Sequence, residues 1–188
     1  AADRLVADNL LLSGTTPTLT IGDAGAEDTK IVFDGNAQDF HIGLDDSADD
    51  LVIGLGSAVG TTPAISIDEN QVVKFDAGIQ EEATALTSGT TVALDLNLGT
   101  VFTLTLAHNL GTFNWTNPAA SGYASSFILK VKQDGTGSRT ISWPAAVDWA
   151  AATAPTISTS ANAVDVFAFF TVDGGTIWYG FTPGIGMA

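Results

Sequence analysis

The chain has no cysteine among its 188 residues, and it is short of basic side chains. The absence of cysteine excludes disulfides, thiolate metal sites and cysteine nucleophiles. Only six Lys and Arg residues stand against 21 Asp and Glu, so the formal net charge is −15. Because nucleic acids are bound through clustered basic residues, this charge excludes a nucleic-acid partner. No apolar run approaches the ~20 residues that cross a bilayer, so we expect no membrane span.

The helix-favouring residues Lys, Arg, Glu and Gln are also few, whereas Thr, Ser, Gly, Val and Ile are abundant. One short segment, 80–83, has the composition of a helical turn. Elsewhere short apolar stretches alternate with Gly, Asp, Asn and Pro, which is typical of strands joined by turns. We therefore expect an all-β protein. The chain begins with Ala1, from which we expect either processing or a C-terminal piece of a longer protein.

Residues 1–76 have the pattern of a repetitive fibrous segment. The sequence GTTP occurs at 14–17 and again at 60–63, and an alternating apolar stretch follows each copy. Large apolar residues recur at every second position, so each short strand offers one apolar face. Strands this short cannot bury that face alone, so we expect a β shaft, similar to a trimeric β-helix or β-prism. The predicted strands are 19–21, 31–33, 40–44, 51–55, 65–67 and 72–75.

Residues 77–188 have the pattern of a compact antiparallel β-sandwich, which we expect to be a tip domain. Alternating strands separated by Asn, Asp and Gly turns are the strongest short-range signal for hairpins. At about 110 residues, the segment is large enough to fold around its own core. The predicted hairpins join 91–96 to 101–106, 127–132 to 139–143, and 164–170 to 176–181.

The residues that most often carry catalysis do not form a recognisable set. His41 lies in an alternating strand and points away from its apolar neighbours, so we expect a solvated or interface side chain. His108 ends a strand, where a turn contact is the simplest role, and no Gly-x-Ser-x-Gly elbow accompanies either histidine. Asp148, beside Trp143 and Trp149, is the best single candidate for an acid/base carboxyl. We expect no enzymatic activity.

An acidic turn in the first half of the chain is the one candidate metal site. Hard cations such as Ca²⁺ prefer several oxygen ligands, so calcium is a possible cofactor there. The turn lacks the spacing of an EF-hand, and a merely solvated turn is the alternative. The carboxylates concerned are Asp45, Asp46, Asp49 and Asp50.

Aromatic residues outside the strands are candidates for glycan contact. All four tryptophans fall in the second half of the chain, and the two in loop-like contexts are predicted to be exposed. An exposed aromatic ring has an apolar face that a sugar ring can cover. The predicted glycan-binding residues are Trp115, Trp149, Asn117 and Tyr123.

Two runs in the second half, 133–144 (QDGTGSRTISWP) and 162–180, resemble the C-terminal domains of bacteriophage tail-fibre-like proteins. The stretches 18–23 and 40–45 are similar to the repeating shafts found upstream in such proteins. The resemblance implies a trimeric virion fibre whose tip often meets the host surface. It implies no catalytic residues.

From these observations we expect the distal part of a phage tail fibre, exposed on the virion and contributing to host-surface attachment. The expected partners are two further copies of the chain, other virion proteins upstream of Ala1 and a host surface glycan. One alternative is a lectin-like receptor-binding module. Another is a head fibre or decoration protein mounted on the capsid.

Overall fold

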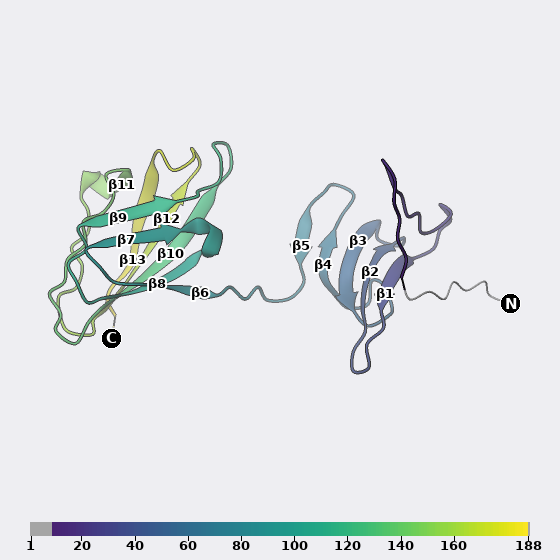
Figure 1. The fold of residues 1–188 in the computed structure, drawn as a ribbon, viewed down its shortest axis with the longest axis horizontal. Coiled ribbons are helices and arrows are strands. Elements are labelled where there is room, and N and C mark those ends of the chain that lie inside the picture. Colours follow the sequence, from purple (N-terminus) through teal and green to yellow (C-terminus); the bar gives the residue numbers. More distant parts are fainter. Residues whose placement is uncertain (1–8, 188) are drawn as a thin grey trace. The chain divides into compact units, whose positions relative to one another are not determined.

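The computed structural model describes residues 9–187, and the chain divides into two compact units, Ala1–Ile79 and Gln80–Ala188 (Figure 1). Within the described residues, the only helices are two three-residue 3-10 turns, η1 (Leu96–Leu98) and η2 (Ala150–Ala152). The all-β prediction is therefore confirmed. The helical turn expected at 80–83 is not formed, because one turn yields too few hydrogen bonds to offset its nucleation. No helix in residues 9–187 is long and apolar enough to cross a membrane.

The N-terminal unit is one antiparallel sheet in which each strand pairs with the next along the chain (Figure 1). Short turns rich in Asp and Gly connect the strands, since these residues accept local hydrogen bonds and left-handed backbone. The strands are β1 (Thr29–Phe33), β2 (Phe40–Asp45), β3 (Asp50–Leu55), β4 (Pro63–Ile67) and β5 (Val73–Phe75).

The two copies of the GTTP repeat have different structures. The second copy leads directly into β4, as predicted. The strand predicted at 19–21 is not formed, and Leu19 and Ile21 are exposed. An isolated strand cannot satisfy its backbone groups, and no strand among residues 9–187 pairs with this segment.

One face of the N-terminal sheet is apolar and open to solvent. The strand register aligns its side chains in three rows, so that each apolar residue lies opposite another on the neighbouring strand. Exposure ranges up to 56 % for Phe33, and Ile53 at the centre of the sheet is still 41 % exposed. We call this surface the apolar face. It consists of Ile31, Phe33, Phe40, Ile42, Leu44, Leu51, Ile53, Leu55, Ile65, Ile67, Val73 and Phe75.

The opposite face of the same sheet is covered by the chain itself. Residues 56–62 fold over it, so that a Cβ on Gly54 would lie only 2.8 Å from the Thr62 carbonyl oxygen. His41 is fully buried there, and its Nδ1 lies 2.9 Å from the Gly56 carbonyl oxygen. The expectation of a solvated or interface histidine is therefore wrong, because the side of the strand that looked polar is the covered one.

The C-terminal unit contains a six-stranded sheet and a two-stranded sheet that share one core. The larger sheet has the order β11-β13-β12-β10-β8-β6, and the smaller one pairs β7 with β9 (Figure 1). Its strands are β6 (Ala83–Leu86), β7 (Thr91–Asp95), β8 (Val101–Leu106), β9 (Thr112–Thr116), β10 (Ser125–Gln133), β11 (Val147–Trp149), β12 (Val164–Thr171) and β13 (Trp178–Met187).

Both sheets contain parallel pairs, so the prediction of an antiparallel sandwich is wrong in this respect. β8 runs parallel to β6 and β10, β11 runs parallel to β13, and β7 runs parallel to β9. The third predicted hairpin is confirmed, because β12 and β13 are antiparallel and Phe170 lies opposite Tyr179.

The first two predicted hairpins are not formed. Aspartates in or beside their predicted turns make hydrogen bonds that direct the chain elsewhere. Asp95 caps η1 by accepting the Asn97 N–H at 2.9 Å, and the chain then crosses from the small sheet to the large one. The Asp-Gly turn at 134–137 is closed by the Asp134 carboxylate, which accepts the N–H groups of Thr136 and Gly137. Residues 139–143 form no strand. Arg139 bonds to Gln133 at the end of β10, and Ile141 forms an isolated parallel bridge with Leu110.

The core of the C-terminal unit lies between the inward-facing side chains of both sheets. Alternate residues of β8, β10 and β12 point into it, as the period of two requires. Aromatic rings supply much of its volume, and Phe127 and Phe169 stack with their centroids 4.9 Å apart. This unit therefore closes its own core, whereas the N-terminal sheet leaves its apolar face open.

The close contact at Gly54 generates a first prediction. A methyl group at this position would lie 2.7 Å from Cε1 of the buried His41 ring, so Gly54→Ala forces the ring or the covering loop to shift. Overpacking of this kind costs about 1–3 kcal/mol. Calorimetry of the full chain should show a lowered Tm for the N-terminal unit. Gly78→Ala, whose methyl group would meet open space, is the control. Equal Tm values for the two variants would contradict the account.

Candidate functional site

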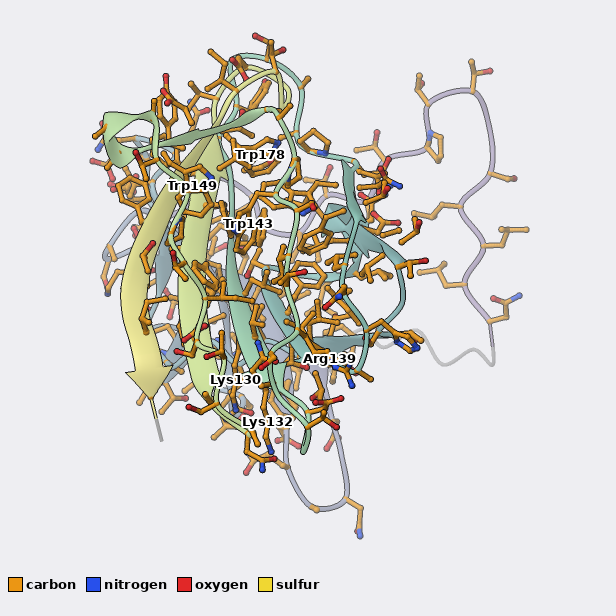
Figure 2. All side chains as sticks on the ribbon, turned by 90° about the vertical axis from the view of Figure 1, so that its left-hand side faces the viewer. Lys130, Lys132, Arg139, Trp143, Trp149 and Trp178 are labelled. Carbon is orange, nitrogen blue, oxygen red and sulfur yellow. The ribbon has the colours of Figure 1, made fainter. Side chains whose placement is uncertain are left out.

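The two tryptophans predicted to be exposed belong to the core of the C-terminal unit. Trp149 is 8 % exposed and packs against Trp143 with ring centroids 5.3 Å apart. Trp115 lies on β9, on the same side of the strand as the buried Phe113, and its ring contacts Phe127 at 4.9 Å. Figure 2 shows Trp143, Trp149 and Trp178 close together beside the large sheet.

The prediction that these two rings are exposed is therefore wrong. Trp149 lies on β11, which pairs with β13, and Trp115 is turned inward by the pairing of β7 with β9. This small sheet covers the inner side of the large one, so alternate residues of β9 must point inward. The indole Nε1 of Trp115 is buried and has no hydrogen-bond partner within residues 9–187. Both indoles are packed among other aromatic rings of the core.

The other two predicted residues do lie at the surface. Tyr123 is 70 % exposed in the loop between β9 and β10. Asn117 directly follows β9 with a φ of 57°, a left-handed conformation that Asn accepts more readily than most residues. Its amide donates a hydrogen bond to Asp95 at 2.7 Å, and this bond is the main reason that the pKa of Asp95 lies below its usual value. The Asn117 side chain is therefore held in place.

A surface cavity of about 430 Å³ adjoins Asn117. We call it the loop cavity, because residues around η1 and from the β9–β10 loop form its wall. Its lining contains amide and hydroxyl groups and no charged side chain, a composition that suits a neutral ligand with several hydroxyl groups. The polar lining residues are Asn97, Thr100, Asn117, Ser125 and Ser126.

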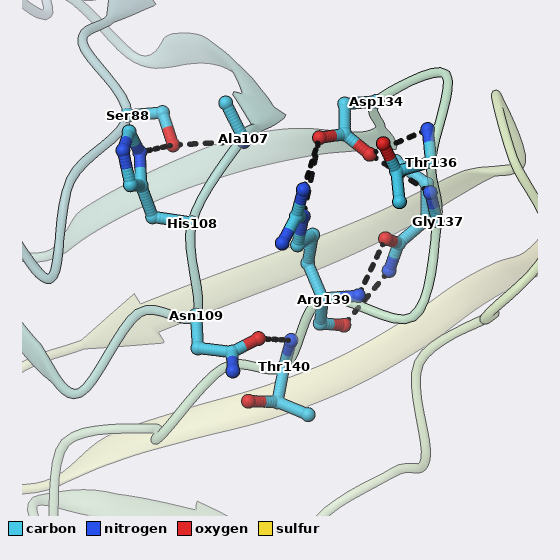
Figure 3. Close-up of polar contacts among 10 residues, drawn as sticks. Ser88, Ala107, His108, Asn109, Asp134, Thr136, Gly137, Arg139 and Thr140 are labelled. Carbon is cyan, nitrogen blue, oxygen red and sulfur yellow. Dashed lines mark hydrogen bonds and ion pairs between the residues drawn. The ribbon is translucent and has the colours of Figure 1, made fainter.

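The run 133–144 is held by a set of polar contacts that we call the clip (Figure 3). Gln133 is 2 % exposed, and its amide donates to the carbonyl oxygens of Arg139 and Ser158 at 2.9 and 2.8 Å. Its Oε1 accepts the Arg139 N–H at 2.9 Å, so every polar atom of this buried side chain is paired. The glutamine thus joins three chain segments.

Asp134 closes the turn of the same clip. Its carboxylate accepts the N–H groups of Thr136 and Gly137, and it pairs with the Arg139 guanidinium at 2.9 Å (Figure 3). These bonds lower the pKa of Asp134, and the bond from Arg139 is the largest cause. Gly137 has a φ of 75°, and a Cβ there would lie 2.5 Å from the Thr159 carbonyl oxygen. Gln133, Asp134 and Arg139 therefore hold the turn and its neighbouring chain segments together.

His108, which lies outside the sheets, is not part of a Ser-His-Asp arrangement within residues 9–187. His108 Nδ1 lies 3.4 Å from the Ser88 hydroxyl, which already accepts the Ala107 N–H at 2.9 Å (Figure 3). No carboxylate within residues 9–187 bonds to His108, so the third member of a triad is absent from that part of the chain. The Asp148 side chain is exposed, in contrast to the neighbouring Trp149, which is buried.

The acidic turn joins β2 to β3. Asp45 accepts both the N–H and the hydroxyl of Ser47, at 3.1 and 2.7 Å, while the N–H of Asp46 donates to Asp28. The carboxylate of Asp45 is thus used to close the turn. No group of three or more His, Cys, Asp or Glu side chains in the described part of the chain is arranged to hold a metal ion. The geometry of Asp45, Asp46, Asp49 and Asp50 gives calcium no support.

Of the residues that line the loop cavity, sequence reasoning found Asn117 and missed the rest. Asn97 and Thr100 lie about twenty residues from Asn117 in sequence and meet it only because β7 pairs with β9 in parallel. A local pattern contains no signal for that pairing, because parallel strands are joined through intervening structure.

Comparison with known proteins yields one match. A family model described as "Putative phage tail fibre C-terminal domain" matches residues 82–176, about half of the chain. The matched stretch lies within the C-terminal unit and contains both the clip and the loop cavity. No curated protein and no solved structure matches the chain.

The clip generates a prediction about pH. Because the folded-state pKa of Asp134 is lowered, its stabilising effect is complete above the ordinary Asp pKa of about 3.9. That effect is lost as the pH falls through the lowered folded-state value. Asp134→Asn should therefore reduce the Tm of the C-terminal unit at pH 7, and the difference from the unmodified chain should shrink below about pH 4. Asp148→Asn, at an exposed carboxylate, is the control. A Tm difference that does not change between pH 7 and pH 3 would contradict this role.

Proposed function

This chain belongs to the family of phage tail fibre C-terminal domains, and from that membership we propose that it forms the distal part of a virion fibre. In this proposal the N-terminal unit is the end of a shaft made from three copies of the chain. The C-terminal unit follows it as a tip that contributes to attachment at the host surface. The observation that carries the proposal is the apolar face of the N-terminal sheet.

An apolar surface of this extent needs a cover. Soluble monomers rarely expose contiguous apolar patches larger than a few hundred Å². The apolar face continues across all five strands, and its central row runs from Ile31 through Ile53 to Phe75. No segment among residues 9–187 covers it, since its members remain exposed or half-buried. Covering it with another copy of the chain would remove this area from water, worth about 25 cal/mol per Å².

The distribution of charge supports the same arrangement. No member of the apolar face is charged. Lys30 and Lys74 lie on the opposite face, paired in register with Gly43 and Ser66, and Lys30 Nζ donates to the Ser57 carbonyl oxygen at 2.6 Å. The described acidic residues of the N-terminal unit lie in turns and loops or, for Asp45 and Asp50, at strand ends, where a cluster of three chains could keep them in water. Three sheets with their apolar faces toward one axis would form a shaft of the β-prism type.

Attachment to the host is the second part of the proposal. The loop cavity and the exposed Tyr123 are the surface features that favour a lectin-like contact with a neutral host glycan. Asn117 is held rigidly by Asp95, so little side-chain entropy is lost when a ligand binds. Replacing Tyr123, which is 70 % exposed, with Ala should then reduce adsorption of the full chain to host cells, without a change in Tm.

Location on the virion decides between a tail fibre and a head fibre or decoration protein. Gold-labelled antibody against the full chain should mark the distal end of tail fibres in electron micrographs of intact virions. Label on the capsid would support the head-fibre alternative. Absence of label from all virions would contradict the virion assignment.

Assembly through the apolar face generates a matched pair of substitutions. Ile53→Glu places a carboxylate at the centre of the face, where burial of an unpaired charge costs several kcal/mol. Val32→Glu introduces the same charge on the opposite side of β1, opposite His41 in register. Sedimentation velocity should show trimers for the unmodified chain and for Val32→Glu, and smaller species for Ile53→Glu. Equal sedimentation of the two variants would contradict assembly through this face.

A further inference from the structure

The outer surface of the six-stranded sheet carries three aromatic side chains that stack on one another. Phe170, Tyr179 and Phe181 lie on neighbouring strands β12 and β13, and they are 36, 40 and 53 % exposed. Phe170 is 5.1 Å from Tyr179 and 6.0 Å from Phe181 between ring centroids, with interplanar angles of 28° and 15°. We call them the aromatic row. These residues lie outside the core, because alternation along the strands directs them to the side opposite the core residues Phe169 and Trp178.

A second surface cavity, also of about 430 Å³, adjoins this row. Its wall combines Tyr179 and Phe181 with the carboxylate-bearing Asp148, an edge of the largely buried Trp149 and the three alanines of η2. Asp148 lies opposite Tyr179 in the parallel register of β11 and β13, so both side chains leave the sheet on the same side. Within residues 9–187 no donor pairs with the Asp148 carboxylate. The cavity lining contains no Lys, Arg or His.

The backbone beside the cavity is strained. Ala151 and Ala152 have φ values of 55° and 53°, in the left-handed region. This conformation is unfavourable for any residue with a Cβ, and Ala has no side-chain hydrogen bond that could compensate. Non-glycine residues in such conformations cluster at ligand-binding and active sites. Both residues belong to η2, which forms one wall of the cavity.

These features together select one ligand chemistry. Aromatic faces attract cations through the ring quadrupole, and a carboxylate without a partner supplies the opposite charge. The negative charge of the whole chain, −15, raises the local concentration of cations and repels anions. We propose that the cavity beside Asp148, Tyr179 and Phe181 binds an organic ammonium group, such as choline or the amino group of an amino sugar.

This site is separate from the loop cavity, and it does not depend on the assembly or virion location proposed above. All its residues belong to the C-terminal unit. A failure to bind ammonium ligands would leave the fibre proposal intact, because antibody labelling and sedimentation test that proposal independently. Conversely, binding of an ammonium ligand would persist if the chain were found on the capsid instead of the tail.

The test uses the full chain and two matched pairs of probes in ligand-observed saturation-transfer NMR. The first pair is choline and its uncharged isostere 3,3-dimethylbutan-1-ol, and the second is glucosamine and glucose. The charged member of at least one pair should bind more tightly than its neutral partner, and the pair that responds identifies the source of the ammonium group. Raising NaCl from about 50 mM to about 500 mM should weaken the binding, because salt screens the carboxylate.

Substitutions locate the binding. Asp148→Asn at this exposed position should weaken binding of the charged probe by between about 2-fold and 30-fold, the range of a cation–aromatic or comparable charge contact. Phe181→Ala should weaken it within the same range, whereas Tyr179→Phe keeps the ring and should bind normally. Tyr123→Ala, beside the other cavity, is the control and should also bind normally.

Three results would overturn the proposal. Charged and neutral members of both pairs could bind equally, which would assign the cavity to uncharged ligands or to none. Binding could survive in Asp148→Asn and Phe181→Ala alike, which would place it elsewhere. Phe181→Ala could lower the sedimenting mass of the full chain, which would show that the aromatic row is a contact between copies.

Discussion

The open apolar face of the N-terminal sheet is the constraint on which the rest of the structure depends. A meander of five strands can cover only one of its two faces with its own chain, and here residues 56–62 cover the side that contains His41. The small residues Gly43 and Gly54 allow that cover to lie close to the sheet. The larger side chains are thereby left on the other side, with Phe33, Phe40 and Leu55 in one row and Ile53 at the centre. Since ordering each residue costs about 1–2 kcal/mol of backbone entropy, burial between copies is the available compensation.

The C-terminal unit solves the same physical problem within one chain. Parallel pairing of β7 with β9 brings the small sheet over the large one, and Trp115 and Trp149 fill the space between them. The clip of Gln133, Asp134 and Arg139 fixes the long connection between β10 and β11 without a strand. A unit that closes its own core can present loops and cavities at its surface, which is what the proposed tip requires. The two units therefore differ in how they bury their apolar residues: the C-terminal unit does so within one chain, and the N-terminal sheet does not.

The sequence predicted strands better than it predicted their partners. Alternation correctly located β2, β3 and β12, because the period of two is a local property. It did not identify which side of β2 would be covered, since Gly and His beside large apolar residues look like an exposed face. Asp95 and Asp134 suggested hairpin turns, yet their carboxylates close a cap and a clip. Of the predicted glycan-binding residues, Asn117 and Tyr123 lie at the surface. The two tryptophans lie on strands of two parallel pairings, β7 with β9 and β11 with β13, that no local pattern reveals.

The central claim is that the apolar face is covered by further copies of this chain, and native mass spectrometry of the full chain tests it most directly. One chain has a mass of 19.3 kDa. The account predicts a dominant species of three times that mass, which persists on dilution and moderate heating because apolar burial is concerted across five strands. A compact, folded species with the mass of a single chain would contradict it.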